Sequence, residues 1–256
     1  GKDDQKIPPG KKEGSTGEDK KKHGRRSFRK PVPSSGVNEQ KSGEVDSISA
    51  SLEENRKSIS QLYDLPKNKD VVIRNFAIGT APPVRCFGIF IDGLTNTTLQ
   101  DLLFQAMMAF AEQTSPLGRG KLVELVKESL LPGNQVVVKS SFREILDGVN
   151  YGDTAFFLEG CSKALLVETK GWERRGVERP QIEQTISGPQ EAFTETLRTN
   201  TALLRKLLKS EQLSTEILTV GSRIKTYVAV MYLRDLANPD LVAEVRRRIE
   251  GIKVDF

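Results

Sequence analysis

The chain has 256 residues, of which 37% are hydrophobic, and it carries a formal net charge of +5 at pH 7. No apolar run of the sequence approaches the roughly 20 residues that a membrane-spanning helix needs, and no apolar leader follows Gly1. His23 is the sole histidine, which excludes His-based catalytic triads and ordinary histidine zinc sites. Cys86 and Cys161 lie in apolar runs, so we expect buried, reduced thiols and no disulfide.

The first segment, residues 1–43, is predicted to be a disordered basic tail. It holds twelve Lys and Arg against six Asp and Glu, so the rest of the chain carries a net charge of −1. Its Lys, Gly, Ser and Pro content leaves too little apolar surface to offset the entropy of ordering. Its basic charge predicts weak attraction to anionic lipid. Phe28 is the only Phe, Tyr or Trp in this segment, so base stacking and specific nucleic-acid binding are not expected.

Residues 44–65 are predicted to form a helix, because apolar residues recur on one face and Pro66 follows. The chain then alternates short apolar runs with amphipathic stretches, which indicates a first α/β subdomain over residues 44–170. Glu159–Ser162 separate two apolar runs and predict a hairpin. Strands are expected at 69–78, 84–91, 134–139, 154–158 and 163–169, and helices at 97–112, 118–131 and 141–149.

A charged segment, residues 171–187, contains Trp172 and Pro180 and is predicted to be a linker. A second α/β subdomain is predicted over residues 188–256. Its expected elements are a helix from Pro189 to Leu207, strands at 214–220 and 225–233, a helix at 239–250 and the start of a strand at 252–256. The predicted fold class is therefore mixed α/β, with two small subdomains, a linker and a basic tail.

The two predicted subdomains share a local pattern. Ile89–Leu99 and Met231–Leu241 each have the pattern of an apolar strand, a polar turn, an Asn N-cap and an amphipathic helix. Asn96 and Asn238 are the predicted caps. Such units are common, so the likeness is also expected by chance; two related lobes that face each other form a cleft, which is a common ligand site.

The helix predicted from Pro189 has an unusual middle. Its acidic residues come early and its basic residues late, which suits the helix dipole. Its apolar face is expected to contain Phe193, Leu197, Leu204 and Leu208. The centre, residues 194–201, is rich in Thr, which is an indifferent helix former. Polar side chains at this centre are therefore candidates for contact with a ligand or a partner.

This stretch, from Gly188 to Leu207, resembles the signature of the spore germinant-receptor A subunits, the GerA family of endospore-forming bacteria. Further matching motifs are Lys170–Arg175, Glu178–Pro180 and the run from Thr226 to Arg248. The motifs stand in the expected order, and the resemblance extends over residues 67–256. One departure is Ser187, which stands where the family usually has Arg.

The resemblance implies the N-terminal domain of an A subunit that acts with B and C subunits in nutrient sensing, and not an enzyme. It implies no catalytic residue, metal or cofactor, self-association through the A subunit, and a membrane region after Phe256. The expected location is the inner spore membrane, with this domain on the cytoplasmic (core) side. Whether a small germinant binds in the cleft between the subdomains is left open by the resemblance. The ligand or interface candidates are Trp172, Arg174, Gly188, Pro189, Glu191, Phe193, Glu195, Arg198 and Asn200.

Two alternatives stand beside a signalling domain whose subdomains move about residues 171–187. Asp153, followed by Glu168-Thr169-Lys170, resembles the pattern of metal-dependent nucleases, in which carboxylates hold Mg²⁺ and a lysine assists the attacking water. The other alternative is an assembly scaffold that binds further subunits and no ligand.

Overall fold

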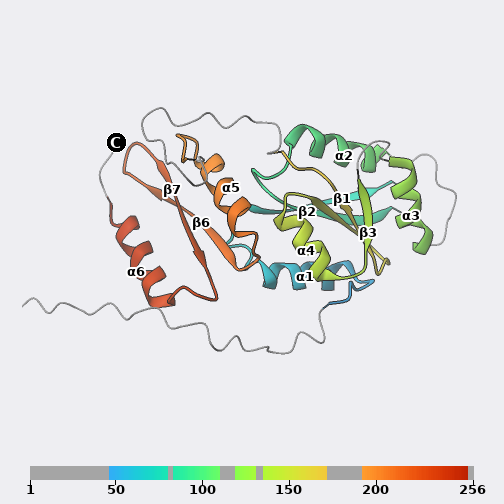
Figure 1. Cartoon of the computed structure of the whole chain (residues 1–256), viewed down its shortest axis with the longest axis horizontal. Coiled ribbons are helices and arrows are strands. Elements are labelled where there is room, and N and C mark those ends of the chain that lie inside the picture. The colour runs from blue at the N-terminus through green and yellow to red at the C-terminus, as the bar shows by residue number, and fades with distance from the viewer. Residues whose placement is uncertain (1–45, 80–82, 110–118, 131–134, 172–191, 253–256) are drawn as a thin grey trace, which may run out of the picture. The chain divides into compact units, whose positions relative to one another are not determined.

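The computed structural model of the chain describes residues 46–79, 83–109, 119–130, 135–171 and 192–252 (Figure 1). Five strands form one antiparallel sheet in the order β1-β2-β4-β5-β3, and two more form a hairpin, β6-β7. The mixed α/β class predicted from the sequence is confirmed. The strands of the first sheet are β1 (Val71–Ile78), β2 (Val84–Ile91), β3 (Val136–Lys139), β4 (Thr154–Leu158) and β5 (Ala164–Val167).

Helices cover both faces of the five-stranded sheet (Figure 1). On one face lie α1 (Leu52–Leu62) and α4 (Phe142–Asn150), and on the other lie α2 (Thr97–Ala109) and α3 (Arg119–Leu130). The central strand β4 is buried on both sides, because its side chains alternate between the two cores. Ala155 and Phe157 pack with α1 and α4, whereas Phe156 and Leu158 pack with α2 and α3.

The hairpin predicted at Glu159–Ser162 is confirmed, because it joins the antiparallel strands β4 and β5. The seven strands in the described part of the chain lie within two residues of their predicted bounds. Cys86 and Cys161 are buried thiols that are not joined in a disulfide, as expected. The Asn caps are also confirmed: the Asn96 side chain accepts a hydrogen bond from Leu99 N at 3.1 Å, and that of Asn238 accepts one from Asp240 N at 2.9 Å.

The helix predicted at 44–65 was wrong in its start, because α1 begins only at Leu52. The Ser51 hydroxyl accepts a hydrogen bond from Glu54 N at 3.4 Å and so caps the first turn. Ile48 is buried in the core, as the apolar pattern indicated, but in the segment before the helix. The capping serine thus places the start of the helix later in the chain than the apolar spacing suggested.

The remaining elements are α5 (Leu197–Leu208), β6 (Leu213–Val220), β7 (Thr226–Leu233) and α6 (Pro239–Glu250). The helix predicted from Pro189 was wrong in its first part, because residues 192–196 are not helical. The reason is Asn200, whose side chain accepts from Thr194 N and donates to Thr194 O, both at 2.7 Å. These two bonds satisfy the backbone of residue 194 outside a helix.

Several predictions fall on residues that the structure does not describe. These are the basic tail at 1–43, the linker at 171–187 apart from its first residue, and residues 253–256 of the last predicted strand. The division into two subdomains therefore stays a prediction. Within the described ranges, every helix is too short or too polar to cross a membrane.

Candidate functional site

One end of the five-stranded sheet gathers four acidic residues. Asp70 precedes β1, Asp92 follows β2, Asp153 precedes β4 and Glu168 follows β5. The strands are antiparallel, so a strand that starts here lies beside one that finishes here, and the four carboxylates share this end. We call these four residues the acidic sheet end; the basic side chains of α5 lie against it.

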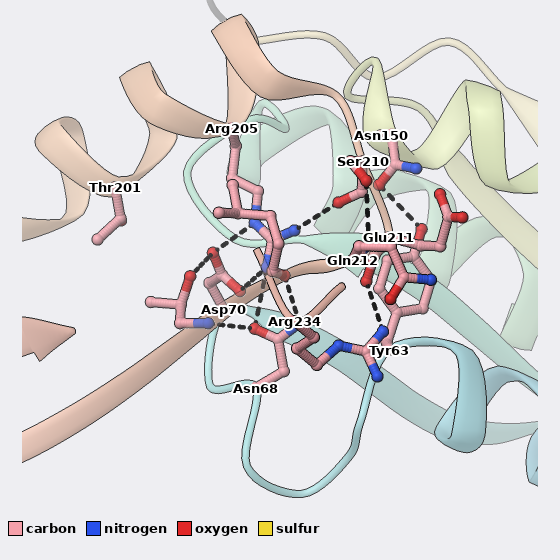
Figure 2. Close-up of polar contacts among 12 residues, drawn as sticks. Tyr63, Asn68, Asp70, Asn150, Thr201, Arg205, Ser210, Glu211, Gln212 and Arg234 are labelled. Carbon is pink, nitrogen blue, oxygen red and sulfur yellow. Dashed lines mark hydrogen bonds and ion pairs between the residues drawn. The ribbon is translucent and has the colours of Figure 1, made fainter. Parts of the chain in front are cut away.

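Arg205 of α5 makes the most buried of these contacts (Figure 2). Its Nε and Nη2 each donate to the Asp70 carboxylate at 2.8 Å, and the two side chains are only 1% and 8% exposed. Nη2 also donates to Asn68 Oδ1 at 2.9 Å, and Nη1 donates to Ser210 O at 3.2 Å. The buried guanidinium is thus held by two parallel bonds to one carboxylate and by two further acceptors, which is the geometry that offsets its desolvation.

The same network reaches β6 through Thr215. The Thr215 hydroxyl donates to Asp70 Oδ2 at 2.8 Å, and Thr215 N donates to Asn68 Oδ1 at 2.9 Å. Asn68 Nδ2 in turn donates to Leu213 O at 3.1 Å, and Lys69 N donates to Thr215 O at 2.8 Å. The segment before β1 therefore joins the five-stranded sheet, the β6–β7 hairpin and α5 in one buried polar cluster.

A second group of hydrogen bonds lies beside this cluster (Figure 2). The Arg234 guanidinium donates to Leu62 O at the end of α1 and, at 3.0 Å, to Glu211 O before β6. The Tyr63 hydroxyl donates to Asn150 Oδ1 at 3.1 Å, and burial raises the pKa of Tyr63. The hairpin is therefore anchored to α1, on one face of the first sheet, as well as to the acidic sheet end.

The beginning of α5 contacts the turn after β2. Arg198 Nη2 lies 2.6 Å from Asp92 Oδ2, and both side chains reach solvent. Gly93 has φ +88°, and a Cβ there would lie 3.1 Å from Ala202 Cβ and 3.2 Å from Arg198 Cγ. Glycine at this position therefore permits both the left-handed turn and the close approach of α5.

The end of α5 meets the sheet end through Tyr151. The ammonium groups of Lys209 and Lys170 lie 4.3 and 4.4 Å from the centre of the Tyr151 ring. Lys170 Nζ also lies 3.3 Å from Glu168 Oε1 and 3.7 Å from Asp153 Oδ1. Burial raises the pKa of Asp153 to about 6, although the nearby Lys170 ammonium opposes this rise.

Gly171, which follows Lys170, explains part of the Lys170–Arg175 motif. A Cβ at Gly171 would lie 2.8 Å from Asn96 N, so only glycine allows the two backbones to pass this closely. Gly171 N donates to Leu94 O at 2.9 Å, and Asn96 N donates to Thr169 O at 2.7 Å. The backbone is thereby fixed beside the cap of α2.

The structure brings together the three residues of the nuclease alternative, Asp153, Glu168 and Lys170. The lysine ammonium pairs with both carboxylates, so its one positive charge offsets part of the negative charge that would attract a metal ion. Among the described residues, no group of three or more His, Cys, Asp or Glu side chains is placed to hold a metal ion. The arrangement fits an ion-pair cluster better than a magnesium site.

Of the predicted interface candidates, four lie in described parts of the chain. Phe193 is 65% exposed, Glu195 is exposed, Arg198 pairs with Asp92, and Asn200 binds the backbone of Thr194. The others, Trp172, Arg174, Gly188, Pro189 and Glu191, lie outside the described residues.

The predicted apolar face of this helix was wrong in part: Leu197 and Leu204 are half-buried, but Phe193 and Leu208 are exposed. The side chains that α5 buries are Thr201 and Arg205, whereas Leu207 and Leu208 are exposed. Sequence reasoning also missed Asn68, Asp70 and Thr215, because Arg205 was assigned to the helix dipole. The one available signal was the polar run Asn68-Lys69-Asp70 directly before an apolar strand.

Comparisons with known proteins identify the family. The family model "Bacillus/Clostridium GerA spore germination protein" matches residues 57–256. Spore germination protein KA of Bacillus subtilis is 27% identical over 210 residues, which cover 82% of this chain and 37% of that protein. The uncharacterized membrane protein YfkQ of the same organism is 31% identical over 210 residues, covering 81% of this chain and 39% of that protein. The chain thus spans about two fifths of the length of these relatives.

A solved structure gives the same result for the fold. The crystal structure of the N-terminal domain of the A subunit of the Bacillus megaterium spore germinant receptor GerK3 matches with a TM-score of 0.65 and 27% identity. The match covers 82% of this chain and 74% of that chain. The chain therefore belongs to the GerA family of spore germination proteins and has the fold of a germinant-receptor A-subunit N-terminal domain.

Proposed function

We propose that this domain transmits a signal within a receptor that triggers spore germination, and that it catalyses no reaction. The observation that carries the proposal is the buried Arg205–Asp70 pair, through which α5 holds the β6–β7 hairpin against the acidic sheet end. Removing one partner of a buried pair leaves an uncompensated charge, so intermediate positions of α5 are unfavourable. An element with few discrete positions suits a two-state transmitter.

In this proposal the domain belongs to an A subunit that acts with B and C subunits at the inner spore membrane, on the core side. Its matched relatives are longer than this chain, and one of them is described as a membrane protein. The membrane-spanning region would belong to a part of the protein outside residues 1–256. Motion of α5 relative to the acidic sheet end would then bias that region.

A germinant bound to this domain would act by preferring one position of α5 over the other. A panel of amino acids, sugars and salts, titrated into the chain and followed by NMR, tests this part of the proposal. Saturable shifts at Arg198, Asn200 and Lys170 support binding beside α5. An absence of shifts with every compound assigns sensing to another part of the receptor and leaves this domain a transmitter or an assembly scaffold.

Charge reversal at the exposed Arg198–Asp92 pair, where α5 contacts the turn after β2, tests signal transmission itself. Spores whose receptor carries Arg198→Glu are expected to germinate more slowly, because Asp92 would then face a like charge. The second change Asp92→Arg is expected to restore the response. Lys57→Glu, an exposed position on α1, serves as the matched control. An unchanged germination response with Arg198→Glu, in a receptor present at normal levels, contradicts the proposal.

A further inference from the structure

The turn between β6 and β7 is both cationic and apolar. The two strands stop pairing at Val220 and Thr226, and Arg223, Ile224 and Lys225 lie in the turn between them. The two basic residues are exposed, and Ile224 is 57% exposed. Hairpin turns ordinarily carry small or polar residues, because an apolar side chain there stays in water. This turn instead presents an aliphatic side chain to solvent between two positive charges.

A second exposed ring lies beside this turn. Tyr227 is 63% exposed and stands opposite Thr219, which is also exposed. Side chains alternate between the two faces of a strand, so Thr219 lies on the same face of β6 as Thr215, whose hydroxyl bonds to Asp70. Tyr227 therefore belongs to the face of the hairpin that meets the five-stranded sheet, at the end of that face nearest the turn.

α6 runs along the other face of the hairpin toward the same end. Arg246 of α6 bonds to Glu216, which lies on the face of β6 opposite to that of Thr215. The helix starts after the end of β7, so it passes Glu216 on the way back toward the turn. Ile252, just after the helix, is 39% exposed. Exposed apolar side chains thus come from both faces of the hairpin to its turn end.

Positive charge prevails at this end of the hairpin. Residues 217–234 contain no Asp or Glu. On α6, two exposed arginines pair with one carboxylate, that of Glu244. Four exposed basic residues stand against two acidic ones and leave a net charge of +2: Arg223, Lys225, Arg247 and Arg248 against Glu244 and Glu250. The turn end therefore attracts anions.

The apolar side chains indicate which anionic surface fits. A nucleic acid binds basic side chains at its phosphates and stacks its bases on aromatic rings, so an aliphatic side chain at the apex of the turn contributes little. A bilayer surface takes cations at its headgroups, aliphatic side chains below them and tyrosine at the boundary. Ile224 between two cations, with Tyr227 close behind, matches the bilayer surface.

We propose that the β6–β7 turn docks end-on onto an anionic lipid surface, with Ile224 among the headgroups and Arg223 and Lys225 against the lipid phosphates. A single inserted aliphatic residue and a few charges give a weak, reversible contact. Docking of this kind sets the long axis of the hairpin across the plane of the lipid surface. The inference goes beyond the proposed signalling role, which needs no lipid contact, and rests on the hairpin and α6 alone.

Sedimentation of the whole chain with vesicles tests the contact. Vesicles of phosphatidylcholine and phosphatidylglycerol in equal parts are compared with vesicles of phosphatidylcholine alone, which are expected to bind less. Arg223→Gln and Lys225→Gln are each expected to lower the partition coefficient on the anionic vesicles roughly fivefold. Ile224→Ser keeps the charge and is expected to lower it about two- to fivefold. Circular dichroism confirms that each variant is folded.

Two exposed residues away from the turn provide matched controls. Lys57→Gln on α1 removes one positive charge, and Leu102→Ser on α2 removes an apolar side chain that is 60% exposed. Both are expected to bind vesicles like the parent. The basic residues of segment 1–43 are present in every variant, so their attraction to lipid is common to all. Turn variants that bind as well as the controls overturn the proposal, and so does a loss at the two cations with none at Ile224→Ser, which indicates a general anion-binding surface.

A spin-labelled lipid locates the contact. Small bicelles of the same anionic composition, with a nitroxide on the headgroup of a minor lipid, are added to the isotopically labelled chain. The amide signals of residues 222–227 are expected to broaden strongly, and those of α2 are expected to stay sharp. Broadening that spares residues 222–227 contradicts docking through this turn, even where the chain binds lipid.

Discussion

Arg205 and Asp70 lie 135 residues apart in the chain and form a buried ion pair with two hydrogen bonds of 2.8 Å. The pair lies where α5, β6 and the segment before β1 meet, so one carboxylate links three parts of the fold. The Asp70 carboxylate also accepts a hydrogen bond from the Thr215 hydroxyl. Its burial is therefore compensated only while both Arg205 and Thr215 are in place. The stability of the junction therefore depends on the guanidinium more than on apolar packing by α5.

The first prediction concerns removal of that guanidinium. Arg205→Met keeps most of the side-chain volume but leaves the Asp70 carboxylate buried without its cation. The free energy of unfolding, measured by urea denaturation, is expected to fall by about 3–5 kcal/mol. Asp70→Leu added to Arg205→Met removes the orphaned charge and is expected to recover part of this loss.

Arg248→Met is the matched control, because Arg248 is 75% exposed and pairs with Glu244 of its own helix. Exposed pairs of this kind contribute less than about 1 kcal/mol. A loss at Arg205→Met no larger than that of the control contradicts the role assigned to the buried pair.

The second prediction concerns the approach of α5 to the turn after β2. Gly93→Ala forces a side chain into φ +88° and places a methyl group 3.1 Å from Ala202 Cβ. A loss of about 1–3 kcal/mol in unfolding free energy is expected, since strain of this kind has that size. Gly251→Ala is the control, because Gly251 has φ −76° and its nearest neighbours lie at 3.4 Å. Equal losses for the two variants are incompatible with a need for glycine at position 93.

The sequence predicted well those elements whose signal is local. The strand at 84–91 has its predicted bounds because a mainly apolar run, interrupted by Arg85, lies between Pro83 and the Asp92-Gly93 turn. The helix from Pro239 was placed correctly because its Asn238 cap and its proline lie next to each other in the chain. Such signals need only a few neighbouring residues, so one sequence is enough to find them.

The junction was not predicted, because its signal is not local. Arg205 has the sequence context of an exposed base in the last turn of a helix, which is a common place for arginine. It is buried only because Asp70 and Asn68, far away in the chain, supply acceptors. The start of α5 was missed for a related reason: a side-chain bond from Asn200 to residue 194 competes with helix formation.

The third prediction concerns the attachment of α6 to β6. Arg246 donates three hydrogen bonds of 2.7–3.0 Å to the Glu216 carboxylate, and the Tyr232 hydroxyl donates a fourth at 2.6 Å. Burial raises the pKa of Glu216, but these hydrogen bonds outweigh burial and hold the pKa below its usual value. Arg246→Gln is expected to raise the Glu216 pKa in an NMR titration and to cost about 1–3 kcal/mol in unfolding free energy.

Arg247→Gln is its control, because Arg247 is exposed and pairs with Glu244 within α6. A change below about 0.5 kcal/mol is expected for it. A Glu216 pKa that is the same in the parent and in Arg246→Gln excludes the proposed effect of Arg246.

The last prediction concerns pH. Burial raises the Asp153 pKa from 3.8 to about 6, so the folded state binds a proton at this carboxyl more readily than the unfolded state. The resulting stabilisation is fully present below pH 4 and is lost as the pH rises through 6. Asp153→Asn removes the ionised form, so the variant is expected to be more stable than the parent at pH 7, by up to about 3 kcal/mol.

Urea unfolding at pH 4, 5, 6 and 7 measures this effect. The difference between Asp153→Asn and the parent is expected to grow with pH and to level off above 6. Asp101→Asn, a carboxylate that is exposed and pairs with Arg74 at the surface, is expected to show little dependence over the same range. If Asp153→Asn lowers stability equally at all four pH values, the Lys170 ion pair must outweigh the desolvation of Asp153, and the cluster stabilises the end of the sheet as an ordinary salt bridge.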